Sequence, residues 1–389
     1  MLALMRQGME KNAAIQESLR INIGPIFLTS ITTAIGFLAM NSSDAPPFHD
    51  LGNITAVGVL LAFIFSVSFL PAFISIVPVK TKTQVNPDQP EAMDKLANFV
   101  IRRQKPLFWS SVGLLIFFAA MIPKITIDDN FVEYFDTSIE FRADSDYIIN
   151  NLTGINSVFY SVDTGESQGI NNPEFLAKIN HFENWLYAQP EVVHVDSISH
   201  ILKRLNKNLH ADNPEWYRIP QEQDLAAQYL LLYEMSLPYG LDLNNQINID
   251  KSATKITVTL GDLSTAQLLD FNSRAETWLQ QNQASQIITK GTSTALMFSS
   301  ITMRNIEQMI EGSIIALVLI SMILLFALRS IKLGILSLVP NLTPVIAAIG
   351  IWALTFNTLG MAAAIVFAIS IGIVVDDAIV VGENIYHYR

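Results

Sequence analysis

The stretch Gly312-Ser-Ile-Ile-Ala-Leu-Val-Leu-Ile-Ser-Met-Ile-Leu-Leu-Phe-Ala-Leu328 contains no charged residue, and Glu311 and Arg329 flank it. A helix rises about 1.5 Å per residue, and the hydrocarbon core of a bilayer is roughly 30 Å thick. The stretch is therefore long and apolar enough to predict a transmembrane helix.

Similar apolar windows recur along the chain, in which 50% of the 389 residues are hydrophobic and only 15% are charged. A buried core helix is the alternative for any one window. Closely spaced pairs with almost charge-free interiors favour the membrane instead. The sequence predicts six spans, which are Asn22–Met40, Asn53–Val77, Pro106–Ile122, Gly312–Leu328, Leu333–Phe356 and Leu359–Gly382.

The distribution of cations predicts how these spans are oriented. Lys and Arg gather before the first span, between the second and third, between the fourth and fifth, and after the sixth. Because cytoplasmic loops carry the excess of Lys and Arg, both termini are predicted to be cytoplasmic. Residues 1–21 then form a cytoplasmic amphipathic segment, residues 22–77 two spans, residues 78–105 a cytoplasmic linker, residues 106–122 one span, and residues 312–389 three spans.

Residues 123–311 are predicted to form an extracytoplasmic α+β domain, because their Asp and Glu outnumber Lys and Arg about two to one. Two strand–helix–strand patterns suggest ferredoxin-like subdomains. A helix over Gln221–Met235 joins them, Pro220 stands where helix-starting prolines are favoured, and Ser264 is a predicted N-cap. The patterned segments are Ser157–Val162, Pro173–Ala188, Val192–Val195, Lys255–Leu260, Ser264–Gln280 and Gln286–Thr289.

No motif in the chain predicts an enzyme, a metal site or a cofactor site. Cysteine is absent, and the net charge of -11 disfavours nucleic acid as a partner. The spacing of His181, His194, His200 and His210 does not match a helical metal site. We therefore expect no catalytic residues, no metal and no cofactor.

The sharpest local feature is the adjacent pair Asp376 and Asp377, with apolar runs on both sides. A carboxylate at the centre of a membrane helix costs about 2.5–3.5 kcal/mol, and such residues are retained mainly as ion or proton sites. Desolvation and mutual repulsion favour the binding of a proton by at least one of the two. The alternative is that the span ends near Val375 and the aspartates only cap it. Glu383 and Asn384 follow two helical turns later and would extend a polar stripe to the cytoplasm.

Hydroxyl groups form a second polar cluster in the first span, at Thr29, Ser30, Thr32 and Thr33. These side chains can donate hydrogen bonds to carbonyls of their own helix, so tight packing between helices is one interpretation. The other is a relay in which Thr29, Thr32 and Thr33 lie beside a carboxylate of a neighbouring helix.

Several of these stretches together resemble the resistance–nodulation–division (RND) superfamily of exporters, and in particular its MMPL-type branch, which shares the sterol-sensing-domain arrangement. The matching stretches are Gly24–Phe37, Asp44–Gly52, Phe69–Ala72, Leu328–Ser330, Gly334, Val339–Asn341, Pro344 and Ile371–Asp377. The residues after the aspartate pair depart from that branch. Ala378 and Val380 stand where it has Thr and His, so this run is closer to multidrug and metal-efflux branches.

The resemblance implies an all-α membrane bundle of six transmembrane helices with an inserted α+β periplasmic domain of ferredoxin-like (porter) subdomains. It implies a proton-driven exporter of hydrophobic or amphiphilic molecules, lipids among them, in the inner membrane, with Asp376 and Asp377 as the proton relay. Membrane lipids, a homo-oligomer and a periplasmic adaptor are the implied partners. The order of spans further implies an out-of-register fragment of a twelve-helix transporter.

Other functions remain open at this point. A sterol-sensing type of membrane protein would bind lipid without pumping. A truncated product would have no activity. A membrane-bound enzyme is the third possibility, and no catalytic motif supports it.

Overall fold

The fold is known from a computed structural model, which describes residues 1–6, 8–78, 92–238, 240–282, 289–327, 331–370 and 372–374. The chain divides into two compact units. Unit 1 comprises Met1–Ile127 and Arg304–Arg389, and unit 2 comprises Asp128–Met303. The domain predicted from the sequence, residues 123–311, contains unit 2 and a few residues on each side of it.

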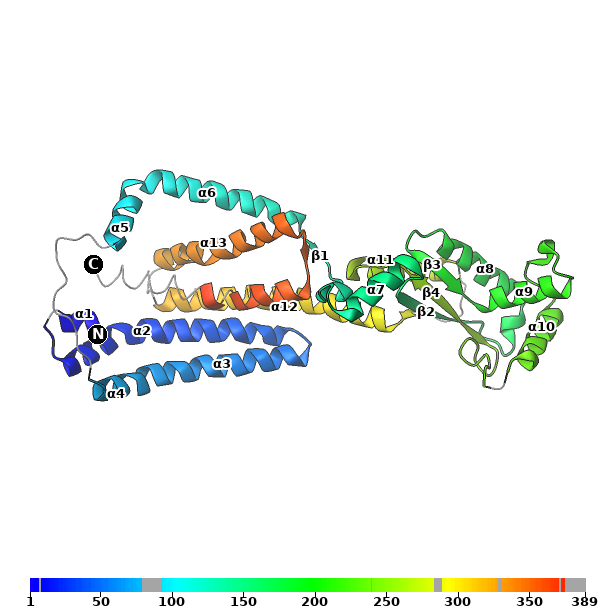
Figure 1. Ribbon diagram of the computed structural model, residues 1–389, viewed down its shortest axis with the longest axis horizontal. Helices are drawn as coiled ribbons and strands as arrows, with labels where there is room; N and C mark the ends of the chain where they lie inside the picture. The colour runs from blue at the N-terminus through cyan, green and yellow to red at the C-terminus, as the bar shows by residue number, and fades with distance from the viewer. Residues whose placement is uncertain are drawn as a thin grey trace. The chain divides into compact units, whose positions relative to one another are not determined.

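Unit 1 is built almost entirely of helices (Figure 1). Two pairs lie side by side, α2 with α3 and α6 with α13. Its elements are α1 (Leu2–Arg6), α2 (Lys11–Leu38), η1 (Ala39–Ser42), α3 (Pro46–Val67), α4 (Phe69–Ile76), α5 (Ala92–Arg102), α6 (Gln104–Met121), η2 (Ile122–Lys124), β1 (Thr126–Ile127), the C-terminal part of α12 (Thr294–Ala327), α13 (Ile331–Thr355) and β6 (Thr358–Leu359), followed by the helix Met361–Val374.

Four helical segments of the described chain are long and apolar enough to cross a membrane, namely Lys11–Ser42, Pro46–Ile76, Gln104–Lys124 and Thr294–Ala327. They correspond to the first four predicted spans. Leu342–Thr355 and Met361–Val374 are shorter apolar helices at the places of the fifth and sixth. The end predicted for the sixth span, Gly382, lies outside the described residues.

The N-terminal segment differs from the single amphipathic helix expected before the first span. A break falls after α1, where Gly8 adopts a φ of +93° that favours glycine. The helix that resumes at Lys11 continues without interruption into the apolar region. The Lys11 ammonium donates to the carbonyls of Ser75 (2.6 Å) and Val77 (2.8 Å), which lie at the C-terminal end of α4.

Proline explains why the second predicted span is two helices. Pro71 has no N–H to donate to the carbonyl of Val67, four residues earlier, and its ring crowds that carbonyl. Accordingly α3 ends at Val67 and α4 begins at Phe69. At its other end α3 starts at Pro46, earlier than the predicted Asn53, since prolines are favoured in the first turn of a helix.

The two residues between the fifth and sixth predicted spans, Asn357 and Thr358, lie beside a short sheet contact. Thr126 and Ile127 of β1 pair in parallel with Thr358 and Leu359 of β6. Trp352 donates its indole N–H to the carbonyl of Thr358 (2.8 Å), which also fixes Thr358.

Unit 2 contains a four-stranded antiparallel sheet in the order β3-β4-β2-β5. A helix follows β2 and another follows β4, and both strand–helix–strand patterns read from the sequence contribute to this one sheet. The elements are η3 (Phe131–Tyr134), α7 (Glu140–Asn151), β2 (Asn156–Asp163), η4 (Gly169–Asn171), α8 (Pro173–Tyr187), β3 (Val192–Asp196), α9 (Ile198–Leu209), η5 (Pro214–Trp216), α10 (Gln223–Ser236), β4 (Ala253–Leu260), α11 (Thr265–Gln281) and β5 (Gly291–Thr292), with the first turns of α12.

Buried and more exposed residues alternate along the central strands, β2 and β4, and this alternation shows which face of the sheet is covered. Val158, Tyr160 and Val162 of β2 are fully buried, as are Ile256 and Val258 of β4. They form one hydrophobic core with the apolar sides of α8 and α11. The intervening residues of both strands are half-buried or exposed, so the helices cover one face of the sheet.

Local capping explains where the helices of unit 2 begin. Ser264 and Gln267 form a capping box at the start of α11, as the sequence predicted for Ser264. Asn172 caps α8 and Pro173 occupies its first turn. The prediction for Pro220 is wrong, since α10 begins at Gln223 after the N-cap Glu222.

Two helices of unit 2, α7 and α9, were not expected from the sequence. The strand predicted at Gln286–Thr289 falls mainly on residues 283–288, which lie outside the described part. The observed edge strand is Gly291–Thr292.

Candidate functional site

The hydroxyl cluster of the first span lies on α2 and is tied to its own helix. Ser30 donates to the carbonyl of Ile26 (2.7 Å), and Thr29 donates to the same carbonyl (3.0 Å). Thr32, which is fully buried, donates to the carbonyl of Leu28 (2.9 Å). A hydroxyl that donates to its own helix still has lone pairs with which to accept.

The same part of α2 touches the helix Met361–Val374 at two glycines. A Cβ added to Gly36 would lie only 2.5 Å from the Cα of Gly372. Beside this contact the Thr33 hydroxyl donates to the carbonyl of Gly372 (3.5 Å). Ala364 and Ala368 of this helix are also buried. With Gly372 they place a small residue at every fourth position, which allows the close approach.

Of the candidate residues, Thr29, Thr32 and Thr33 therefore lie on the helix that packs against Gly372. Asp376, Asp377, Glu383 and Asn384 lie outside the described residues. The relay role of all seven stays a prediction. Asp376 follows Gly372 by four residues in the sequence.

A second polar region of unit 1 lies in the α2–α3 turn, residues Ala39–Ala45, where it meets α12. Ser43 and Asn305 are both 1% exposed, and the Ser43 hydroxyl donates to Asn305 Oδ1 (2.8 Å). The Ser42 hydroxyl donates to the carbonyl of Gln308 (2.8 Å). Arg304 and Asp44 form an exposed ion pair (2.9 Å).

Gly312 lets the turn approach α12 this closely, because a Cβ there would lie 2.1 Å from Ser42 Oγ. Sequence reasoning missed this contact. Its signal is the spacing of Arg304, Asn305, Gln308 and Gly312, which places polar and small residues on one side of a helix.

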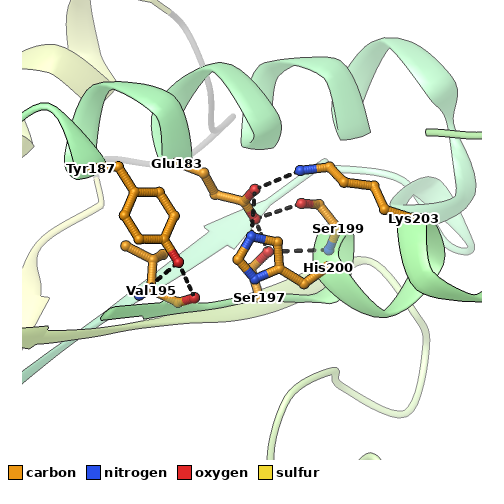
Figure 2. Close-up of polar contacts among 7 residues, drawn as sticks. All are labelled: Glu183, Tyr187, Val195, Ser197, Ser199, His200 and Lys203. Carbon is orange, nitrogen blue, oxygen red and sulfur yellow. Dashed lines mark hydrogen bonds and ion pairs between the residues drawn. The ribbon is translucent and has the colours of Figure 1, made fainter. Parts of the chain in front are cut away.

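Unit 2 holds a buried charged cluster between α8 and α9 (Figure 2). Glu183, which is 1% exposed, accepts hydrogen bonds from the hydroxyls of Ser197 and Ser199 through Oε1. Its Oε2 accepts from the ammonium of Lys203 (3.0 Å) and lies 3.5 Å from His200 Nε2. Ser197 also caps α9 by accepting from the N–H of Ser199 (3.1 Å).

This cluster joins two helices, and its two serine hydroxyls are closed to a substrate. Ser197 and Ser199 are 1% and 0% exposed, so neither hydroxyl can reach one. Glu183 lies on the apolar side of α8, next to Ile179, Phe182 and Leu186. A carboxylate in that position is the sequence signal that α8 has a buried polar partner, although it does not identify α9.

Two tyrosines of unit 2, the buried Tyr160 and the more exposed Tyr187, have pKa values above that of a free phenol. Burial raises the pKa of Tyr160, and the nearby Glu276 carboxylate raises it further. The Tyr160 hydroxyl donates to Asn272 Oδ1 (3.1 Å). Burial also raises the pKa of Tyr187, whose hydroxyl donates to the carbonyl of Val195 (3.2 Å). Within the described residues, no group of three or more His, Asp or Glu side chains could hold a metal ion.

Comparison with known families identifies the chain. Residues 3–115 match the MMPL family, and residues 271–388 match the AcrB/AcrD/AcrF family. Both are families of the RND superfamily, which the resemblance in the sequence had indicated. The second match includes Asp376 and Asp377, and it agrees with the likeness of the run after them to the multidrug branch. The RND families matched are multi-pass membrane transporters and not enzymes.

A solved structure shares the fold. The hedgehog release protein Disp from the water bear Hypsibius dujardini matches 92% of this chain, with a TM-score of 0.57 and 13% identity. The chain spans about half of Disp, covering 49% of its length. SecDF in its super-membrane-facing form matches with a TM-score of 0.40 and 13% identity, over 98% of this chain and 40% of SecDF, and nothing is inferred from that weaker likeness. No curated protein matches the sequence.

Proposed function

We propose that this chain is part of a proton-driven RND exporter of hydrophobic or amphiphilic molecules, lipids among them. The contact between Thr33 and Gly372 carries the proposal. It sets the hydroxyls of α2 against the helix whose sequence continues to Asp376 and Asp377. The family matches support a transporter but leave its energy source and cargo open.

The direction of the two helices supports a site shared between them. Met40 of η1, which directly follows α2, packs in one cluster with Ala364, whereas Gly36 and Thr33 of α2 meet Gly372. The helices therefore run antiparallel. Asp376 follows Gly372 by four residues, and Thr29 precedes Thr33 by four, which is about one helical turn in each case. The proposal therefore expects the Asp376 carboxylate beside Thr29.

A carboxylate in that place would suit proton coupling. Hydroxyls of α2 could accept from a protonated carboxyl or donate to a charged one, which would lessen the cost of charge in an apolar bundle. Glu383 and Asn384 would extend the polar path toward the cytoplasm. Binding and release of the proton would then shift the balance between two arrangements of the helices.

Unit 2 would handle the cargo on the periplasmic side, with both chain termini in the cytoplasm. Its strand order, with one helix after β2 and one after β4, is that of a ferredoxin-like split βαβ fold, which supports a porter subdomain. A homo-oligomer and a periplasmic adaptor belong to the same proposal. The chain has no cysteine, so single cysteines on either side of a span would test the orientation by labelling from one side.

Substitution of the aspartates tests the proposal directly. Full-length transporter carrying Asp376→Asn or Asp377→Asn should lose pH-gradient-driven export of a fluorescent lipid from proteoliposomes. Asp270→Asn, at an exposed side chain of unit 2, is the matched control and should retain export. Wild-type export by both membrane variants would defeat the proposal and favour a sterol-sensing type of protein that binds lipid without pumping.

Hydroxyl removal tests the part of the site that α2 supplies. Thr33→Val should slow pH-driven export, since it removes the group that reaches Gly372 while keeping the shape of the side chain. Thr55→Val is the control, because Thr55 of α3 is half-buried and donates to a carbonyl of its own helix, at Leu51 (2.7 Å). Equal export rates for the two variants would show that α2 contributes packing alone.

A further inference from the structure

The short helix α5, Ala92–Arg102, exposes an apolar side. Leu96, Phe99 and Val100 stand at the spacing that brings residues to one side of a helix, and they are 56%, 50% and 47% exposed. Lys95, Asn98 and Arg102 lie on another side by the same spacing, and all three are exposed. The helix is thus amphipathic, with an apolar side of aromatic and aliphatic groups in the open.

The position of α5 in the chain places it at the edge of a membrane span. Only Arg103 separates α5 from α6, whose apolar segment Gln104–Lys124 is long enough to cross a bilayer. At about 1.5 Å per residue, the 11 residues of α5 are too few to cross the hydrocarbon core. A bilayer around α6 therefore has its boundary with water where α5 ends.

The charges at this boundary are positive. Lys95 and Arg102 lie on α5, Arg103 stands between the two helices, and Lys105 is the second residue of α6. Cations beside a membrane surface are attracted to anionic headgroups, and an amphipathic helix rich in cations lies in the plane of the interface with its apolar side in lipid. Charge and continuity with the span both favour the lipid surface over a protein partner.

We infer that α5 lies in the membrane boundary, with Leu96, Phe99 and Val100 in lipid, and that Lys95, Arg102, Arg103 and Lys105 bind anionic phospholipid headgroups of that leaflet. The inference stands on the geometry of α5 and α6 and is independent of proton coupling. An anchor of this kind would fix the level of α6 in the bilayer.

Probe depth tests where the apolar side lies. Because the chain has no cysteine, Phe99→Cys and Asn98→Cys each give one attachment point for a spin label in the full chain. In phosphatidylcholine vesicles containing phosphatidylglycerol, the probe at position 99 should be accessible to oxygen and shielded from a water-soluble relaxation agent. The probe at position 98 should show the reverse.

Lipid retention tests the headgroup preference. Wild-type chain purified from mixed vesicles should retain phosphatidylglycerol severalfold over phosphatidylcholine, as measured by mass spectrometry. Lys95, Arg102, Arg103 and Lys105 changed together to Gln should lose this enrichment. A matched variant carries Gln at four cationic positions of unit 2, namely Lys178, Arg204, Lys207 and Lys290. It loses the same amount of charge and should keep the enrichment of phosphatidylglycerol.

Three results would overturn the inference. Equal exposure of both probes to water would show that α5 does not lie in the membrane boundary. Shielding of the probe at position 99 from both agents would indicate a protein partner on the apolar side. No enrichment of phosphatidylglycerol on the wild-type chain, a result that depends on no variant, would remove the headgroup site.

Discussion

Close packing of Gly36 against Gly372 leaves no room for a side chain at Gly36. Gly36→Ala should push α2 away from the helix Met361–Val374 and destabilise unit 1 by about 1–3 kcal/mol, as overpacking does. Thermal unfolding of the purified chain in detergent measures the effect. Gly58→Ala on α3 is the control, since nothing lies within 4 Å of a Cβ there. Equal stability of the two variants would contradict the close contact.

Glu183 balances the buried charge of Lys203, so its removal should be costly. Glu183→Gln should destabilise unit 2 by about 3 kcal/mol, because it leaves the Lys203 ammonium buried without a counter-charge. Hydrogen exchange at the amides of α8 and α9 would report the loss. Asp270→Asn, which breaks the exposed pair with Arg274, should cost under about 1 kcal/mol. A similar loss of stability in the two variants would show that the Glu183 and Lys203 charges interact only weakly.

Tyr160 should make unit 2 sensitive to alkaline pH. Its raised pKa keeps the folded phenol neutral, whereas the unfolded phenol ionises above about pH 10. The unfolded state then binds fewer protons than the folded state, so stability falls as pH rises through that value. Tyr160→Phe should cost about 1 kcal/mol at neutral pH, through loss of the bond to Asn272. In urea unfolding, the difference in free energy of unfolding between the wild-type chain and Tyr160→Phe should narrow above about pH 10. A difference that stays constant with pH would contradict the raised pKa of Tyr160.

At the scale of elements, the α2–α3 turn depends on its buried hydrogen bond to α12. Ser43→Ala leaves Asn305 Oδ1 without its donor in a buried place and should cost about 1–3 kcal/mol. Asn41→Ala in the same turn is the control, because Asn41 bonds to Asn53 (2.9 Å) at an exposed position. Thermal unfolding compares the two, and an equal loss would mean that the turn is not fixed by Ser43.

How far the sequence predicted these elements depends on whether local chemistry sets them. The start of α11 follows from Ser264 and Gln267 alone, and a capping box is readable without a structure. The break before Pro71 has a local cause, the missing N–H, but the sequence prediction placed one uninterrupted span over Asn53–Val77. Helix α9 depends on a distant partner, since Glu183 of α8 binds its Ser199 and Lys203. No local pattern contains that partner.

The candidate site divides in the same way. Hydroxyls in an apolar span were predicted as a relay or as packing, and their spacing along α2 was readable from the sequence. Their contact with Gly372 joins residues more than three hundred positions apart, and it depends on two glycines whose meeting no periodicity shows. The strand order of unit 2 is equally non-local, because β4 lies between β2 and β3.

For the whole molecule, the division into two units predicts that unit 2 folds alone. Its sheet, α8 and α11 form one hydrophobic core without residues from unit 1. Residues 128–303 expressed alone should unfold cooperatively and give dispersed amide signals by NMR. The Glu183→Gln form of the same segment should unfold at lower urea concentration. A collapsed segment without dispersed signals would contradict independent folding.

The pairing of β1 with β6 holds Ile127, the residue at which the chain passes from unit 1 to unit 2. This arrangement has a consequence for the exchange of domains between proteins. Both chain connections to unit 2 leave unit 1 from a single apolar cluster, to which Ile127 contributes just before Asp128 and Ile306 just after Met303. An insert whose two attachment points are close together and held by the host adds little loop-closure entropy, whatever its length. A different domain that ends in a helix continuing into α12 at Arg304 could therefore be grafted in place of unit 2. Recombination could renew the external part of such a protein while its membrane part is inherited intact.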